Sequence, residues 1–265
     1  MAKIRWLLVF LLAGSFCGNA QVEKIDTDRP DQTESAVLVP RHYFQAEFGF
    51  NKENTGNRDY DLIYPAALLK YGMKGFEFRL EATYKNNYIH LIPNPQKTTG
   101  FEPLVIGFKA ALWEEKKLRP KTSLIAHLGI PVLGSPAFRP DHLFPSFRFT
   151  FQNSLAEHIA IGYNLGAEWD GYTGTPAWIY TLAPGFELGE KWYAYVEAFG
   201  FIRKNESPEH NLDAGLAYFI NPDLKIDISG GVGISESAPK NYIAVGLSFR
   251  VNTRKVKTTE DPPNK

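Results

Sequence analysis

Apolar and polar residues alternate with a period of two along most of the chain. In residues 76–84 the apolar side chains Phe76, Phe78 and Leu80 share one face. Glu77 and Arg79 lie on the opposite face. Successive side chains of a β-strand point to opposite faces, so this pattern predicts a strand that is apolar on one side and charged on the other.

Segments of this kind recur over the whole chain and predict about twelve strands. They cover residues 42–51, 62–73, 76–85, 101–113, 121–130, 143–154, 159–169, 177–188, 192–202, 211–220, 224–234 and 241–251. Most have the length of about 9 to 11 residues that a tilted strand needs to cross a bilayer. An even count is usual for single-chain outer-membrane barrels. We therefore expect an all-β fold, an antiparallel transmembrane β-barrel of about 12 strands over residues 42–251.

The connections alternate between short and long. The short set is 74–75, 114–119, 155–158, 189–191 and 221–223, and the long set is 52–61, 86–100, 131–142, 170–176, 203–210 and 235–240. Outer-membrane barrels have short periplasmic turns and longer extracellular loops. The pattern therefore predicts that both termini face the periplasm.

A soluble β-sandwich is the main alternative, because it also shows alternation and regularly spaced turns. Aromatic residues near strand ends favour the membrane barrel, whose outer surface carries aromatic girdles at both interfaces. These residues are Tyr84, Trp169, Trp178, Trp192 and Tyr242.

Charged and polar side chains occupy mid-strand positions on the face opposite the apolar one. We expect these charged and polar side chains to line the lumen. They are Glu77, Arg79, Glu81, Lys109, His127, Arg148, Glu168, Glu187, Glu197, Asp213, Asp227 and Arg250. The same assignment predicts that Leu80→Arg on the lipid face costs far more stability than Arg79→Gln in the lumen.

The N-terminus has the pattern of an export signal. Lys3 and Arg5 precede an apolar run over 6–16, and Gly18-Asn19-Ala20 fits a cleavage site before Gln21. This signal would export the protein, which we expect in the cell outer membrane. Cleavage of residues 1–20 would remove the only cysteine. An uncleaved anchor and lipidation of that cysteine are the two weaker alternatives.

Composition excludes several partners and cofactors. The chain has 265 residues with 29 Lys and Arg against 29 Asp and Glu, which gives no basic surface for nucleic acid. No Cys-pair or His-x-Glu-x-x-His spacing is present, so we expect neither a metal nor another cofactor. Outer-membrane lipid and small-molecule solutes remain the expected partners.

The segment after the export signal resembles the opening of a family of Gram-negative outer-membrane β-barrels. The motif is Asp28-Arg29-Pro30-Asp31-Gln32-Thr33-Glu34, and weaker matches lie at 69–72, 77–80, 104–109 and 245–250. Family members are labelled transporters or meta-pathway of phenol degradation proteins. The resemblance implies an outer-membrane location and transport of small solutes, with aromatic compounds as one candidate class. The polar tail 252–265 departs from the family pattern.

The polar segment 21–41 has two interpretations. It either enters the barrel as a plug that pairs Arg29 with inward carboxylates, or it caps the periplasmic rim from below. Pro30 and Pro40 disfavour a helix but do not decide between these positions.

Three functions fit the sequence, in order of preference. A barrel of about twelve strands has a narrow lumen, which suits a channel or transporter for small solutes. A sealed barrel that serves as a structural or partner scaffold is the alternative, because the inward charges can pair with each other. An outer-membrane lipid hydrolase is third: Ser123 and His127 share a strand face, but at four residues' separation they lie about 13 Å apart.

Overall fold

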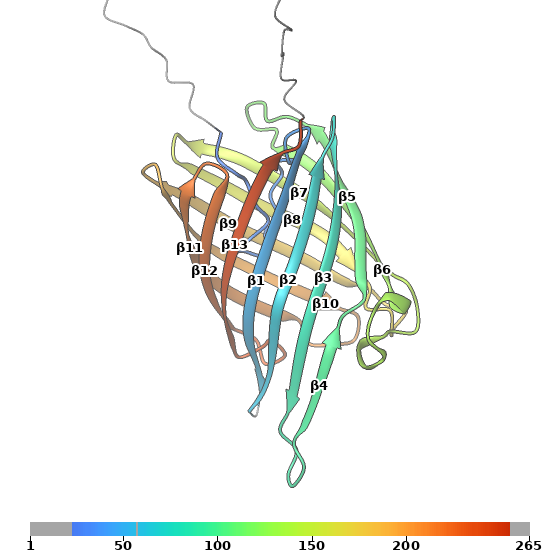
Figure 1. The fold of residues 1–265 in the computed structure, drawn as a ribbon. Helices are drawn as coiled ribbons and strands as arrows, with labels where there is room; N and C mark the ends of the chain where they lie inside the picture. Colours follow the sequence, from blue (N-terminus) through green and yellow to red (C-terminus); the bar gives the residue numbers. More distant parts are fainter. Residues whose placement is uncertain (1–22, 57, 255–265) are drawn as a thin grey trace, which may run out of the picture.

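A computed structural model describes residues 23–56 and 58–254 of the chain, which fold into a β-barrel (Figure 1). The predicted export signal lies outside the described residues, as does most of the tail. The strands are β1 (Tyr43–Gly56), β2 (Asp59–Gly72), β3 (Phe76–Ile89), β4 (Gln96–Phe101), β5 (Leu104–Trp113), β6 (Lys121–Ile130), β7 (Phe144–Ala156), β8 (Ile159–Glu168), β9 (Ala177–Leu188), β10 (Trp192–Arg203), β11 (Glu209–Asn221), β12 (Leu224–Gly233) and β13 (Asn241–Asn252).

The strands form one closed antiparallel sheet, because β13 pairs with β1 along its whole length, from Tyr43 opposite Asn252 to Asn54 opposite Asn241. Neighbours in the chain are neighbours in the barrel. The strands β4 and β5 occupy a single position, since both pair with β3. The predicted all-β barrel of twelve strands is confirmed.

The single strand predicted over 101–113 is interrupted. The strand β4 ends at Phe101 and β5 begins at Leu104, with Glu102 and Pro103 between them. A proline has no N–H to donate to the strand ladder, so pairing stops there. Two short 3-10 helices, η1 (Pro131–Leu133) and η2 (Pro136–Phe138), follow β6. Beside them the Ser135 N–H donates to the Phe101 carbonyl (2.9 Å). Nowhere in residues 23–56 and 58–254 is a helix long and apolar enough to cross a membrane.

Residues 23 and 254, where the described chain begins and ends, lie at one rim of the barrel, which we call the terminus rim (Figure 1). The turns at this rim are short, as expected, and Gly75 and Gly189 adopt φ values of 81° and 71° there, which suit glycine. At the far rim two predicted loops are wrong. Residues 52–56 and 59–61 continue β1 and β2, and 86–89 with 96–100 form a protruding hairpin of β3 and β4. These extensions carry polar residues on both faces, so apolar and polar residues do not alternate there and the pattern does not predict a strand.

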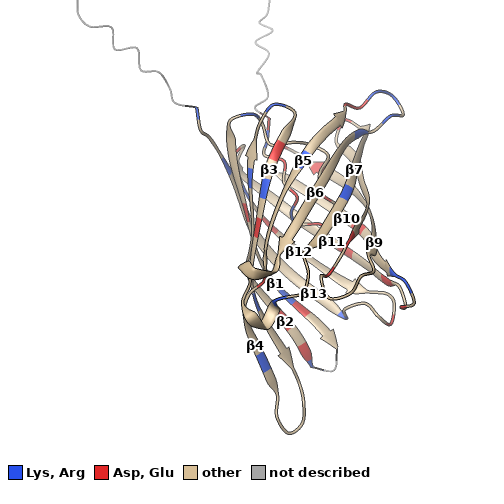
Figure 2. Ribbon diagram, turned by 90° about the vertical axis from the view of Figure 1, so that its right-hand side faces the viewer, with Lys and Arg blue, Asp and Glu red and all other residues tan. Residues whose placement is uncertain are grey.

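The outer surface of the barrel is apolar and its interior is charged. Neighbouring residues on β3 show this directly: Phe78 is 54% exposed, whereas Arg79 is 3% exposed. Trp178 and Trp192 are exposed on the outside, as the girdle prediction requires. The girdle prediction is wrong for Tyr242, because its hydroxyl donates to inward-facing Asp213. Charged positions lie on the strands as well as on the loops (Figure 2). A soluble sandwich would bury the apolar face, so this arrangement identifies a membrane barrel.

We expect Leu80→Arg to lower the free energy of unfolding by about 2 to 4 kcal/mol, because it places a charge near the middle of the lipid-facing belt. Leu118→Arg is the matched control, since Leu118 lies in a terminus-rim turn and is 95% exposed. Urea titration of the barrel in vesicles measures both. Equal costs for the two variants would mean that the faces are misassigned.

Candidate functional site

Residues 23–40, here called the inner segment, run inside the barrel. Their hydrogen bonds and ion pairs reach inward side chains all round the wall, which are Glu47, Lys70, Arg79, Lys109, Ser123, Arg148, Asn164, Thr181, Glu197, Asp227 and Arg250. The segment therefore occupies part of the lumen rather than capping the rim from below.

Asp28 is the centre of the strongest set of contacts. Its carboxylate accepts hydrogen bonds from Lys70 (2.8 Å), Arg79 (2.9 Å) and Lys109 (2.9 Å). Its backbone N–H donates to Glu47 (3.0 Å). All five residues are buried. We call them the Asp28 cluster, and such paired, hydrogen-bonded charges satisfy one another in the interior.

Arg79 links this cluster to the rest of the inner segment. Its guanidinium donates to Asp28, to Glu77 (3.1 Å) and to Glu34 (2.6 Å). Its Nε also donates to Nε2 of His127 (3.0 Å). The planar fork of arginine suits several acceptors at once. Strand β3 thereby holds two points of the inner segment, Asp28 and Glu34, through one side chain.

The surrounding cations set the charge state of Asp28. Burial alone acts to raise the pKa of Asp28, but the ammonium groups of Lys109 and Lys70 and the guanidinium of Arg79 outweigh it and hold the pKa well below its usual range. A carboxylate with a depressed folded pKa stabilises the folded state above its unfolded pKa and loses that contribution as pH falls through the folded value.

We therefore expect acidification from pH 7 to pH 5 to leave the Asp28 anchor in place. Protease protection of the inner segment in the folded barrel measures this. Release of the segment between pH 7 and 5 would contradict the ion-pair account.

The segment makes a second set of contacts with β8, β9 and β10. The Gln32 N–H and the Thr33 hydroxyl donate to the Glu197 carboxylate at 2.8 and 2.6 Å. The Glu34 N–H donates to Asn164 (2.7 Å). Burial and the neighbouring Glu197 carboxylate raise the pKa of Asp31 well above its usual range. This contact region is therefore acidic, in contrast to the cationic side chains around Asp28.

Arg29 bonds to a third part of the wall, where it pairs with Asp227 on β12 (3.0 Å). Glycines make the room for it. A Cβ at Gly49 would lie 2.2 Å from Arg29 Nη1, and one at Gly246 would lie 2.5 Å from its Nε. A larger residue at either position would have to displace the guanidinium, so the two glycines of β1 and β13 leave room for this side chain.

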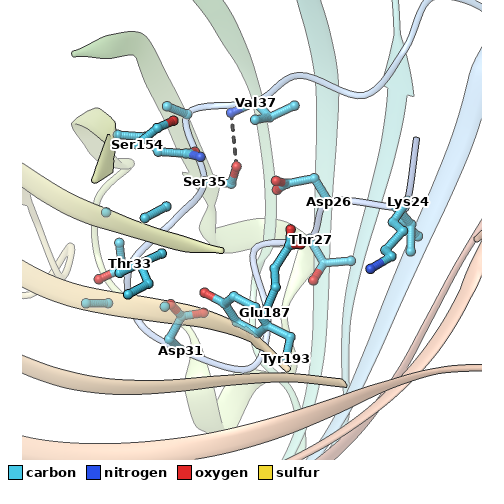
Figure 3. A pocket seen from close by; sticks show the side chains of 18 of the residues that line it. Lys24, Asp26, Thr27, Asp31, Thr33, Ser35, Val37, Ser154, Glu187 and Tyr193 are labelled. Atoms are coloured by element: carbon cyan, nitrogen blue, oxygen red, sulfur yellow. Dashed lines mark hydrogen bonds between the residues drawn. The ribbon is translucent and has the colours of Figure 1, made fainter. Parts of the chain in front are cut away.

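A cavity of about 630 Å³ lies beside the inner segment near the terminus rim (Figure 3). One side is the segment itself from residue 23 to 37, and the other is formed by β7, β8, β9 and neighbouring strands. Tyr193 gives it aromatic surface, while Asp31 and Lys225 bring charges of both signs. A volume of this size admits a small organic molecule.

The chain matches a family model described as "Putative MetA-pathway of phenol degradation" over residues 27–251. The chain belongs to this family. The match begins at the inner segment and ends in β13, so the family pattern covers both the barrel and the segment inside it. No match to the chain was found among curated protein sequences.

Solved structures with a similar fold are outer-membrane channels and porins. An outer membrane channel from Pseudomonas putida F1 has a TM-score of 0.64 at 10% identity, covering 86% of this chain and 100% of that one. The KdgM porin has a TM-score of 0.53 at 8% identity, with 77% and 98% covered. The NanC porin has 0.51 at 9%, with 78% and 100% covered. At these identities the likeness shows an outer-membrane barrel fold.

The structure divides the sequence-predicted lumen residues into two groups. Those that contact the inner segment are Glu77, Arg79, Lys109, Arg148, Glu197, Asp227 and Arg250. The others have partners in the wall: Glu81 with His127, Glu168 with Arg148, Glu187 with His158, and Asp213 with Tyr242. Glu187 lies at the terminus rim, is half-exposed and lines the cavity beside the inner segment.

Sequence reasoning missed Lys70, Glu47 and Lys225 as members of the site. Lys70 follows Leu68 and Leu69, which put apolar side chains on both faces and obscure the alternation. Its signal is its register: Lys70 lies directly opposite Arg79 on β3. Lys225 donates to the Arg29 carbonyl (2.9 Å) and Glu47 accepts from Asp28, so both serve the inner segment.

The side chains weighed for hydrolysis have other partners. The Ser123 hydroxyl donates to the Ala36 carbonyl (2.7 Å), and His127 accepts from Arg79. A nucleophile needs a base within hydrogen-bond reach, and His127 does not supply one to Ser123. In the described part of the chain no group of three or more His, Cys, Asp and Glu side chains is placed to hold a metal ion.

Proposed function

We propose that the protein is a narrow outer-membrane channel for small solutes, in which the inner segment forms the constriction. The observation that carries this proposal is the position of residues 26–39, which bond to the wall from inside the lumen while a cavity of about 630 Å³ stays open beside them. A segment that served only to stabilise the barrel would be expected to fill the lumen and leave no such cavity. Its contacts reduce the bore and select for size.

The lining suits polar solutes without a large net charge. Lys24 and Lys225 face the cavity together with Asp26 and Asp31, and Tyr193 offers an aromatic face. Charges of both signs give little ion selectivity. We propose neutral or zwitterionic compounds as solutes, with small aromatic compounds passing over the tyrosine. The porins and the channel with a similar fold support transport over catalysis, and we assign no enzymatic role.

Export precedes this function. We propose that residues 1–20 are removed before Gln21 and that the mature chain inserts with its terminus rim in the periplasm. Intact-mass measurement of the outer-membrane protein tests the cleavage, and a mass that retains residues 1–20 would contradict it.

Flux into liposomes tests the channel. The purified mature barrel should pass small sugars or aromatic acids faster than empty liposomes do. Removal of residues 21–35 should increase the flux severalfold, because it takes away all three sets of wall contacts, those of Asp28, of Arg29 and of residues 32–34. The alternative is a sealed scaffold barrel, which the complete pairing of the Asp28 cluster favours. No flux from either form of the protein would establish that alternative.

A further inference from the structure

An aromatic pair flanked by two lysines stands on the outer face of β1 to β4. The rings of Tyr60 and Tyr88 stack with centroids 4.4 Å apart. Lys52 Nζ lies 5.0 Å from the Tyr60 ring centroid and Lys97 Nζ lies 5.2 Å from that of Tyr88. Ammonium groups at this distance from a ring face are attracted by its quadrupole, which orders two otherwise flexible side chains. We call these four residues the Lys–Tyr ladder.

The register places the ladder on the outside of the barrel, away from the lumen. Lys52 lies opposite Ile243, which is 55% exposed on the apolar face. Tyr88 is an even number of residues from Phe78 on the same strand and so shares its face. Lys52 and Lys97 are both exposed, and within the described ranges neither has a carboxylate at ion-pair distance. Two ordered cations are therefore available to an external anion.

The ladder lies directly beyond an aromatic belt. Phe50, Tyr64, Tyr84 and Phe101 form this belt on neighbouring strands, where Tyr84 contacts both Tyr64 and Phe101 edge to face. Lys52 is two residues past Phe50 and Tyr88 is four past Tyr84, which is about 7 and 13 Å along the strands. Aromatic belts sit at the edge of the hydrocarbon layer, so the ladder lies at the depth of lipid headgroups. The ladder lies at the rim opposite the termini, so these headgroups belong to the outer leaflet.

We propose that the Lys–Tyr ladder binds the phosphate groups of a phosphorylated, acylated glycolipid of the outer leaflet. The ammonium groups match the phosphates in charge, and the belt below them accepts the acyl chains. Ordering by the tyrosine rings lowers the entropic cost of fixing each lysine. Such a lipid would fix the protruding β3–β4 hairpin against the membrane surface. This site is independent of the channel proposed above, because it lies on the other face of the wall.

Native mass spectrometry of the full mature barrel with added diphosphorylated lipid A tests the proposal. We expect the unmodified barrel to bind the lipid and the double variant K52A/K97A to bind at least fivefold less. K116A/K117A is the matched control, because it removes two exposed lysines from a terminus-rim turn, and it should bind like the unmodified barrel. K52R/K97R keeps the positive charges and should keep the binding. This variant distinguishes loss of charge from loss of folding as the cause of weaker binding by K52A/K97A.

Three results would overturn the proposal. The first is equal binding by K52A/K97A, in a form that still migrates as a folded barrel on unheated gels. The second is equal binding of lipid A from which both phosphates have been removed. The third is displacement of the lipid by millimolar inorganic phosphate, which would make the ladder a general anion site rather than a lipid site.

Discussion

Asp28→Asn will raise the flux of small solutes through the barrel severalfold. The asparagine keeps the shape of the side chain but removes the charge that faces Lys70, Arg79 and Lys109. Breaking a buried ion pair on one side costs about 3 to 5 kcal/mol, since it leaves the partner charges uncompensated. Hydration of Lys109, Lys70 and Arg79 would then lower their free energy, and the inner segment would lose its strongest attachment.

Liposome flux measures this effect, with Asp141→Asn as the matched control. Asp141 is exposed in the connection between β6 and β7, so the same chemical change there should leave the flux unchanged. The barrel itself should stay folded, because the strand ladders do not involve Asp28. An unchanged flux in Asp28→Asn, with the barrel folded, would show that the Asp28 cluster does not hold a constriction.

Arg79→Gln will lower the free energy of unfolding by about 3 to 5 kcal/mol, a larger cost than the lumen position alone suggests. The sequence places Arg79 in a polar lumen, where loss of its charge should be mild. The structure instead surrounds it with the carboxylates of Asp28, Glu34 and Glu77. Its removal would leave these acids with less positive charge around them in a buried region.

Urea titration in vesicles measures the Arg79→Gln effect. Arg41→Gln, at an exposed arginine near the terminus rim, should change stability by less than about 0.5 kcal/mol. A cost for Arg79→Gln as small as that of the control would mean that water, and not the carboxylates, compensates Arg79.

The strands of the barrel wall can be predicted from the sequence, because the face of each side chain depends only on its neighbours in the same strand. Phe78, Arg79 and Leu80 alternate, and each one's face follows from the pleat of its own strand. The predicted strands match the observed ones closely in the membrane-crossing part. The pattern weakens where both faces meet water, so alternation predicts loops where β1, β2 and β3 extend beyond the bilayer.

The interior is not readable in this way, because its contacts are long-range. Asp28 bonds to residues 42, 51 and 81 positions further along the chain. Nothing in the local sequence shows whether a polar segment enters the lumen or lies beneath it. Only the closed barrel, with cations of β2, β3 and β5 pointing to one place, decides between those positions.

Single-channel conductance in planar bilayers tests the central claim most directly, namely that the inner segment constricts an otherwise open lumen. The mature barrel and a form lacking residues 26–35 should be compared under identical salt and voltage. We expect small, resolvable steps from the mature barrel and steps several times larger from the shortened form. The absence of conductance from both forms, with each shown to be inserted and folded, would contradict the account.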